Sequence, residues 1–128
     1  MPRSTYDKIA ANTGLKLHTL CLLDIKVKEQ TVENLLKGNN KFEPPRFMTI
    51  AQAATLLLKM EKEFGGGVCG EDARAIGIAR VGHSTQLIRG GTLLELSTSD
   101  FGAPLHSLVL AGELHPEELK WYEHYCKK

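Results

Sequence analysis

Apolar and polar residues alternate over several short stretches of this chain, as they do in β-strands. In the first stretch, residues 17–27, every second residue from Leu17 to Val27 lies on one face, and both faces are apolar in the middle. That pattern predicts an interior strand that is covered on both sides. The same reasoning predicts further strands over residues 74–81, 86–89 and 105–110.

The strongest helix signal begins at Thr49. Thr49 and Gln52 have the spacing of a capping box, in which each side chain binds a backbone amide at the helix start. Apolar residues then recur at helical spacing as far as Phe64, and Gly65 follows as a left-handed stop. A helix that packs its apolar side on the sheet is therefore predicted.

Two more helices are predicted nearer the end of the chain. Thr92 and Glu95 repeat the capping-box spacing, and Pro116 stands where proline favours the first helical position. Residues 6–15 lack a clear period and are interpreted as a lead-in segment, and residues 29–46 as a long loop that is either functional or a plain surface crossover. The predicted fold is α/β: one mixed β-sheet of four to five strands with helices packed on it.

Composition narrows the classes of function. The 128 residues carry sixteen basic and fifteen acidic side chains, so no basic surface for nucleic acid is indicated. No apolar run approaches the ~20 residues of a membrane span, and we expect a soluble protein that binds neither nucleic acid nor a membrane. Three scattered cysteines and an N-terminus without an apolar signal core predict a reducing, cytoplasmic location and no disulfide framework.

A face with few side chains is a candidate ligand site. Gly77 and Ala79 lie on the small face of the strand predicted over residues 74–81. Such a face lets a helix pack tightly or lets a ligand lie against the backbone, and the sequence does not choose between them. His106 likewise either faces a cleft or has a structural role. Ser84 lies in no nucleophile elbow, and the five histidines lack metal-binding spacing, so neither hydrolysis nor a metal site is expected.

Several longer motifs follow one another along the chain. They are H-T-L-C-L-L-D-I-K-V-K-E-Q (18–30), E-P-P-R-F-M (43–48), A-R-V-G (79–82), G-T-L (91–93), D-F-G-A-P-L-H-S-L (100–108) and G-E-L-H-P (112–116). On these motifs the chain resembles the diphthine synthases, which are methyltransferases of the tetrapyrrole-methylase-like superfamily. The resemblance covers nearly the whole chain, and residues 18–30 resemble the eukaryotic branch. The chain departs from its relatives where His83, Ser84 and Thr85 follow A-R-V-G, which alters the loop beside that motif.

The resemblance implies a two-domain enzyme that uses S-adenosylmethionine to methylate the modified histidine of elongation factor 2. The product is diphthine or, in eukaryotes, its methyl ester, an intermediate of diphthamide biosynthesis. Residues 1–128 would form the C-terminal domain of this tetrapyrrole methylase-like fold, with the N-terminal domain absent, and we expect the isolated chain to be inactive. The resemblance also implies a homodimer. The alternative is a non-catalytic module, derived from that domain, that dimerises or binds a partner.

Three cofactor-binding positions carry over from the family, namely Leu23, Val81 and His106, and all three lie at ends of predicted strands. For Leu23 and Val81 we expect main-chain hydrogen bonds to the adenine and apolar contact with its ring, and for His106 backbone or ring contacts to the adenosine. By the same resemblance, the small face through Gly77 and Ala79 is expected to lie near the ligand. No catalytic residue is expected, because the reactive methyl group belongs to the cofactor.

Overall fold

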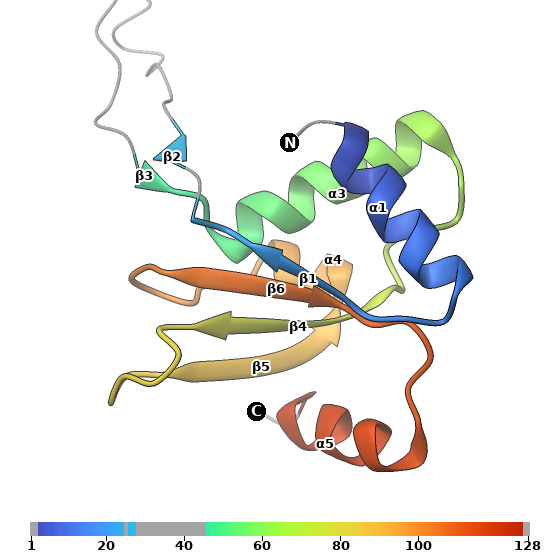
Figure 1. Cartoon of the computed structure of the whole chain (residues 1–128). Coiled ribbons are helices and arrows are strands. Elements are labelled where there is room, and N and C mark those ends of the chain that lie inside the picture. The colour runs from blue at the N-terminus through green and yellow to red at the C-terminus, as the bar shows by residue number, and fades with distance from the viewer. Residues whose placement is uncertain (1–2, 25, 28–45, 127–128) are drawn as a thin grey trace, which may run out of the picture.

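A computed structural model of the chain describes residues 3–24, 26–27 and 46–126. Its main feature is a four-stranded sheet in the order β1-β6-β4-β5, in which every neighbouring pair is antiparallel (Figure 1). The strands are β1 (Thr19–Leu22), β4 (Arg74–Ala79), β5 (Leu87–Thr92) and β6 (His106–Leu110). Two short strands, β2 (Lys26–Val27) and β3 (Arg46–Phe47), pair separately. The predicted α/β class is confirmed, whereas the mixed pairing that we predicted does not occur among these strands.

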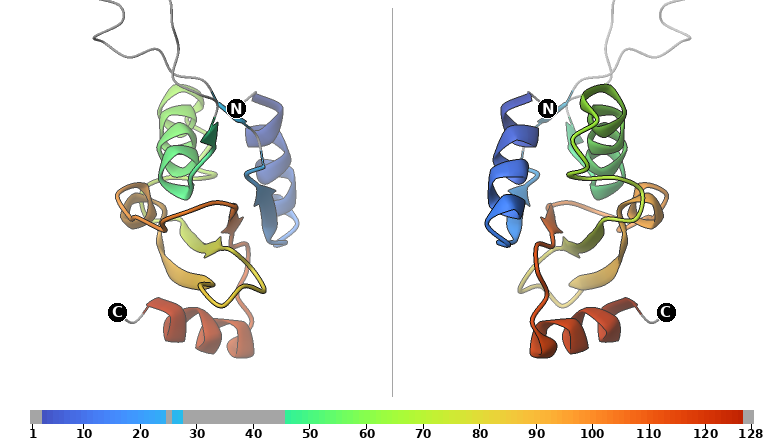
Figure 2. Two further views of the ribbon diagram at one scale, coloured as in Figure 1. Left: turned by 90° about the vertical axis from the view of Figure 1, so that its left-hand side faces the viewer. Right: turned by 90° about the vertical axis from the view of Figure 1, so that its right-hand side faces the viewer.

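Helices lie on both sides of the sheet. They are α1 (Arg3–Gly14), α3 (Ile50–Phe64), α4 (Leu93–Ser97) and α5 (Pro116–Cys126). Figure 2 shows α1 and α3 on one side of the sheet and α5 on the other. None of the helices in the described ranges is long and apolar enough to cross a membrane.

The helix α3 begins where the sequence predicts. The Thr49 hydroxyl accepts from the Gln52 amide at 3.1 Å, and the Gln52 side chain accepts from the Thr49 amide at 2.9 Å, which completes the capping box. The helix ends at Gly65, whose φ of 66° is left-handed. On its apolar side Ile50 and Leu57 are fully buried in the core, whereas Met60 and Phe64 nearer its end are partly buried. The second predicted capping box, before α4, is also present.

The prediction of an irregular lead-in over residues 6–15 is wrong, because most of this stretch belongs to α1. Only Tyr6 and Ile9 of this helix are buried. With so narrow an apolar side, apolar residues do not recur at helical spacing along the sequence. The Asn12-Thr13-Gly14 turn signal marks the C-terminal end of the helix rather than a loop, and the amides of Leu15 and Leu17 both donate to the Asn12 carbonyl.

The interior strand predicted over residues 17–27 is also wrong in part. Regular pairing with β6 covers only β1, which lies at the edge of the sheet. Cys21 faces the core, but Leu20 and Leu22 on the other face are 59% and 61% exposed. The alternation correctly indicates two apolar faces, yet it cannot reveal whether a second layer covers each of them. The long loop predicted over residues 29–46 lies almost wholly outside the described residues.

The C-terminal helix α5 packs against β5 through Tyr122. The Tyr122 hydroxyl is buried and donates to the Gly91 carbonyl at 2.8 Å. A Cβ at Gly90 would lie 3.1 Å from the Cys126 sulfur, so the absence of a side chain there allows α5 to approach the strand closely.

Candidate functional site

The antiparallel pairing brings the three predicted cofactor positions together where strands of the sheet begin or end. We call this end of the sheet the candidate cofactor edge. At this edge β1 and β4 end and β6 begins. The Leu23 amide donates to the His106 carbonyl at 3.2 Å. His106 is opposite Ala79 in the pairing of β4 with β6, and Val81 follows two residues later. Positions that are far apart in sequence therefore lie together, and their role in binding a cofactor stays a prediction.

The three side chains differ greatly in exposure. Leu23 is 1% exposed and His106 is 3% exposed, whereas Val81 is 66% exposed. Leu23 and His106 are thus part of the core as whole residues, and in this structure neither presents an exposed surface to a ligand. Val81 is the one of the three whose side chain is free to contact a ligand directly.

Both nitrogens of the His106 imidazole form hydrogen bonds with backbone groups of this chain. Its Nδ1 accepts from the backbone amide of Ile50 at 3.1 Å. Its Nε2 faces the carbonyl oxygens of Gly102 and Ala103, at 3.0 and 3.1 Å, to which it can donate. This arrangement fits the neutral tautomer with its proton on Nε2. The ring therefore joins the start of α3 to the segment before β6. The ring or backbone contact of His106 with an adenosine stays a prediction.

The sequence gives no prediction for Arg80, which has the most contacts at this edge. The φ of Arg80 is 53°, a left-handed value that is uncommon for a residue other than glycine. Its guanidinium donates to the carbonyls of Phe101 and Ala103 on one side and of Thr85 on the other. A lone basic residue inside the A-R-V-G motif, at the end of an apolar strand, is the only sequence signal for this role.

The small face of β4 is filled by protein. A Cβ added at Gly77 would lie 2.9 Å from Cδ1 of Ile50 and closer still to the ring of Phe101. Ala75 and Ala79 on the same face are fully buried. Of the two alternatives that the sequence leaves open, tight packing is the correct one, and the expected ligand proximity along Gly77 and Ala79 is wrong.

No protein-family model matches the chain. Curated relatives do match it: a diphthine methyl ester synthase of Aspergillus fumigatus is 56% identical over 111 residues, which cover 87% of this chain and 39% of the relative. The enzyme of that name from Saccharomyces cerevisiae is 48% identical over 121 residues, covering 94% of this chain and 40% of the relative. A solved diphthine synthase structure, 26% identical, superposes with a TM-score of 0.70 over 97% of this chain and 40% of its own.

The resemblance to the diphthine synthases is thereby confirmed. A further crystal structure, described as a diphthine synthase from Entamoeba histolytica, agrees with a TM-score of 0.79 at 38% identity, over 97% of this chain and 44% of its own. The chain spans less than half the length of the diphthine methyl ester synthases that it matches. Its assignment to the C-terminal domain of such an enzyme stays a prediction.

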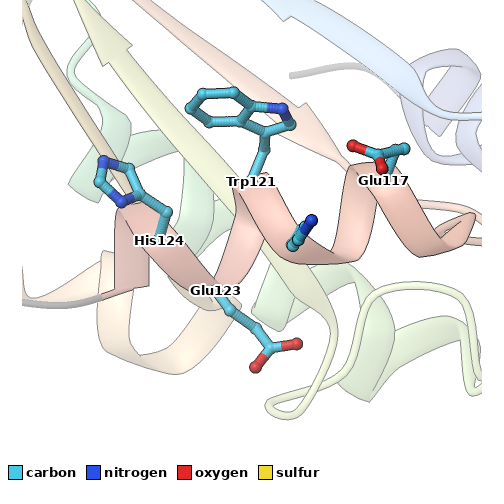
Figure 3. Close-up of a pocket in the computed structure, with 5 residues that line it drawn as sticks. Glu117, Trp121, Glu123 and His124 are labelled. Atoms are coloured by element: carbon cyan, nitrogen blue, oxygen red, sulfur yellow. The ribbon is translucent and has the colours of Figure 1, made fainter.

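Two of the surface hollows formed by the described residues lie away from the positions that the diphthine synthase resemblance assigns to the cofactor. One, of about 480 Å³, is lined only by residues of α5, among them Trp121 and His124 (Figure 3). The other, of about 610 Å³, lies between α3 and the loop at Gly70. Neither is lined by any of the three predicted residues. Within the part of the chain that the structure describes, no group of three or more potential ligands could hold a metal ion.

Proposed function

We propose that this chain is part of an S-adenosylmethionine-dependent methyltransferase that acts on the modified histidine of elongation factor 2 in diphthamide biosynthesis. The support is the 56% and 48% identity to the two curated diphthine methyl ester synthases described above, over 87% and 94% of the chain. The single structural observation behind the proposal is the convergence of Leu23, Val81 and His106 on one edge of the sheet. A cytoplasmic location and elongation factor 2 as the protein partner belong to the same proposal.

The residues at this edge fit one wall of a nucleoside site. The Val81 side chain is exposed and aliphatic, which suits apolar contact with an adenine ring. Next to it, Gly82 has open space around the position of a Cβ, so a planar group has room to approach the backbone. Leu23 and His106, which are buried, would form the base of this wall. When bound, the cofactor supplies the methyl group, and these residues orient it and exclude water.

The proposal assigns only part of the site to this chain. The N-terminal half of the intact enzyme would provide the opposite wall of the site, so the isolated chain would bind S-adenosylmethionine very weakly and transfer no methyl group. Isothermal titration calorimetry tests this with the 128-residue chain and with a longer protein that includes the N-terminal half. We expect binding only in the longer protein, and weaker binding after Val81→Asp. Micromolar affinity of the short chain alone would contradict the proposal.

A second candidate function is a module that binds a partner, and the edge strand favours it. Leu20 and Leu22 project from β1 on the face opposite α3, where they are more than half exposed. Neighbouring exposed leucines on an edge strand are typical of a surface that another protein covers. We propose that this surface contributes to a homodimer.

Light scattering after size-exclusion chromatography tests the dimer. We expect Leu20→Glu combined with Leu22→Glu to shift a dimeric chain to the monomer mass. As a control, Leu94→Glu places the same charge at an exposed leucine of α4 and should leave the mass unchanged. A monomeric wild-type chain would count against the homodimer.

A further inference from the structure

The end of β4 is fixed by the backbone of Arg80. Its amide donates to the Leu105 carbonyl at 2.9 Å, just before β6, and its carbonyl accepts from the His83 amide at 3.0 Å. Together with the φ of 53°, these bonds turn the chain out of the sheet. Val81 is therefore directed away from β4 and into solvent by the conformation of its neighbour.

The guanidinium of Arg80 connects two separate segments. On one side it donates to the Phe101 carbonyl at 2.7 Å and to the Ala103 carbonyl. On the other side Nη2 donates to the Thr85 carbonyl at 3.0 Å, and Nε donates to the Thr85 hydroxyl, also at 3.0 Å. The first segment, residues 101–105, leads into His106, and the second, residues 81–86, contains Val81. One side chain thus sets the spacing between the two segments.

All these acceptors are uncharged. Among the described residues, no ion pair involves Arg80. Its guanidinium instead donates hydrogen bonds to carbonyl and hydroxyl oxygens. Contacts with both segments at once need the planar fork of a guanidinium, which the ammonium of lysine does not provide. The Ala103 carbonyl also accepts from His106, so the side chains of both residues hold the same segment.

We propose that Arg80 is a positioning residue that holds the two backbone segments of the candidate cofactor edge at a fixed distance. The inference rests on the function proposed above, because only a ligand that contacts both segments makes that distance matter. It assigns to Arg80 no contact with the ligand itself. Loss of its guanidinium loosens both segments together and weakens binding, while the rest of the sheet keeps its structure.

Hydrogen–deuterium exchange of the full chain gives the first test. In Arg80→Ala we expect exchange of amides in residues 81–87 and 101–106 to rise by about tenfold or more, because charge-assisted hydrogen bonds are lost at both. Amides in the middle of β4 should keep their protection. Arg74→Ala is the matched control, since Arg74 begins the same strand at its opposite end and is exposed. If only one segment loosens in Arg80→Ala, or if Arg74→Ala has the same effect, the inference is wrong.

Chemical rescue separates positioning from plain destabilisation. Millimolar methylguanidinium should restore the exchange rates of Arg80→Ala, because it can occupy the vacated site. It should also restore the affinity for S-adenosylmethionine of that variant in the longer protein, which we expect to be about tenfold weaker than that of the wild type. A protein that is merely less stable would not be rescued by a denaturant. If Arg80→Ala does not fold, Arg80→Lys is used, with smaller increases in exchange expected at the same two segments.

The two proposals fail in different ways. If the longer wild-type protein does not bind S-adenosylmethionine, both the proposed function and the positioning role of Arg80 are wrong. Normal binding by the wild type and by Arg80→Ala alike would overturn only the role of Arg80. Failure of methylguanidinium to restore either exchange or binding would also overturn that role.

Discussion

The backbone amide of Ile50 donates to Nδ1 of His106 at 3.1 Å, which joins the first residue of α3 to the first residue of β6. The first amides of a helix have no partner within the helix, so a buried one needs an acceptor from elsewhere. The Thr49 hydroxyl accepts from the amide of Gln52, and the His106 ring accepts from the amide of Ile50. The histidine that the resemblance assigns to a cofactor site is therefore also a helix cap.

Replacing His106 by alanine should lower the free energy of unfolding by about 2–4 kcal/mol, because the Ile50 amide loses its partner and a buried cavity forms. Urea unfolding followed by circular dichroism measures this. His83→Ala, at an exposed histidine of the neighbouring turn, is the control and should have little effect. Equal stability of the two variants would show that the cap contributes nothing.

The parts of the fold that the sequence predicts well are those decided by local chemistry. The capping residues Thr49 and Thr92 begin helices as expected, and Gly65 ends one. The errors concern burial by distant elements. Residues 3–14 form a helix that packs on α3 through few residues, and the second apolar face of β1 has no covering layer. The spacing of apolar residues within one segment reveals neither fact, because both depend on distant elements.

The family resemblance predicts which positions form the candidate site. It does not predict which contacts the side chains at this site make. Leu23, Val81 and His106 lie together because the register pairs residue 79 with 106 and continues to residue 23. That the His106 ring points inward, and that Arg80 links two segments, depends on hydrogen bonds between residues about 20 or more apart in sequence. No pattern within a single strand reports such bonds.

Gly77 should not tolerate a side chain. The Cβ of Gly77→Ala would overlap the Phe101 ring and approach Ile50, and we expect a loss of about 1–3 kcal/mol of unfolding free energy. Thermal unfolding measures it. Gly70→Ala is the control, because nothing lies within 4 Å of a Cβ there. Phe101→Leu should offset part of the loss when combined with Gly77→Ala, and additive losses in the double variant would contradict overlap as the cause.

Cys69 should be unreactive in the native protein. Burial raises the pKa of its thiol to about 12, and the charges of Glu61 and Cys21 act in the same direction. Since the thiolate is the reactive form, alkylation by iodoacetamide at about pH 8 should modify Cys69 only when the chain unfolds. Cys126, which is partly exposed, should react earlier. Peptide mass spectrometry follows both sites, and equal rates in native protein would contradict the prediction.

The carboxylate of Glu61 should make stability depend on pH. It accepts from the amides of Gly67, Val68 and Cys69 at 2.8, 2.6 and 2.8 Å and from the Tyr6 hydroxyl at 3.1 Å. Burial alone would raise the pKa of Glu61, but these donors outweigh it and hold the pKa below the ordinary value of 4.5. The ionised form therefore stabilises the loop that follows α3.

A lowered pKa fixes the sign of the pH dependence. The contribution of Glu61 is fully present above the unfolded value of 4.5 and is lost as the pH falls through the lower folded pKa. At neutral pH, Glu61→Gln should cost about 1–3 kcal/mol of unfolding free energy, because a charged acceptor is lost. The difference from wild type should shrink as the pH falls below 4.5. Urea unfolding across this range measures it.

Glu63→Gln is the matched control for this measurement, because it makes the same change at an exposed position two residues further along α3. Its unfolding free energy should stay close to that of the wild type at every pH. A deficit in Glu61→Gln that stays constant below pH 4.5 would mean that the amide contacts do not depend on the charge of the carboxylate. The donors around Glu61 would then act as ordinary hydrogen bonds, and the acid sensitivity of the chain would have to come from other groups.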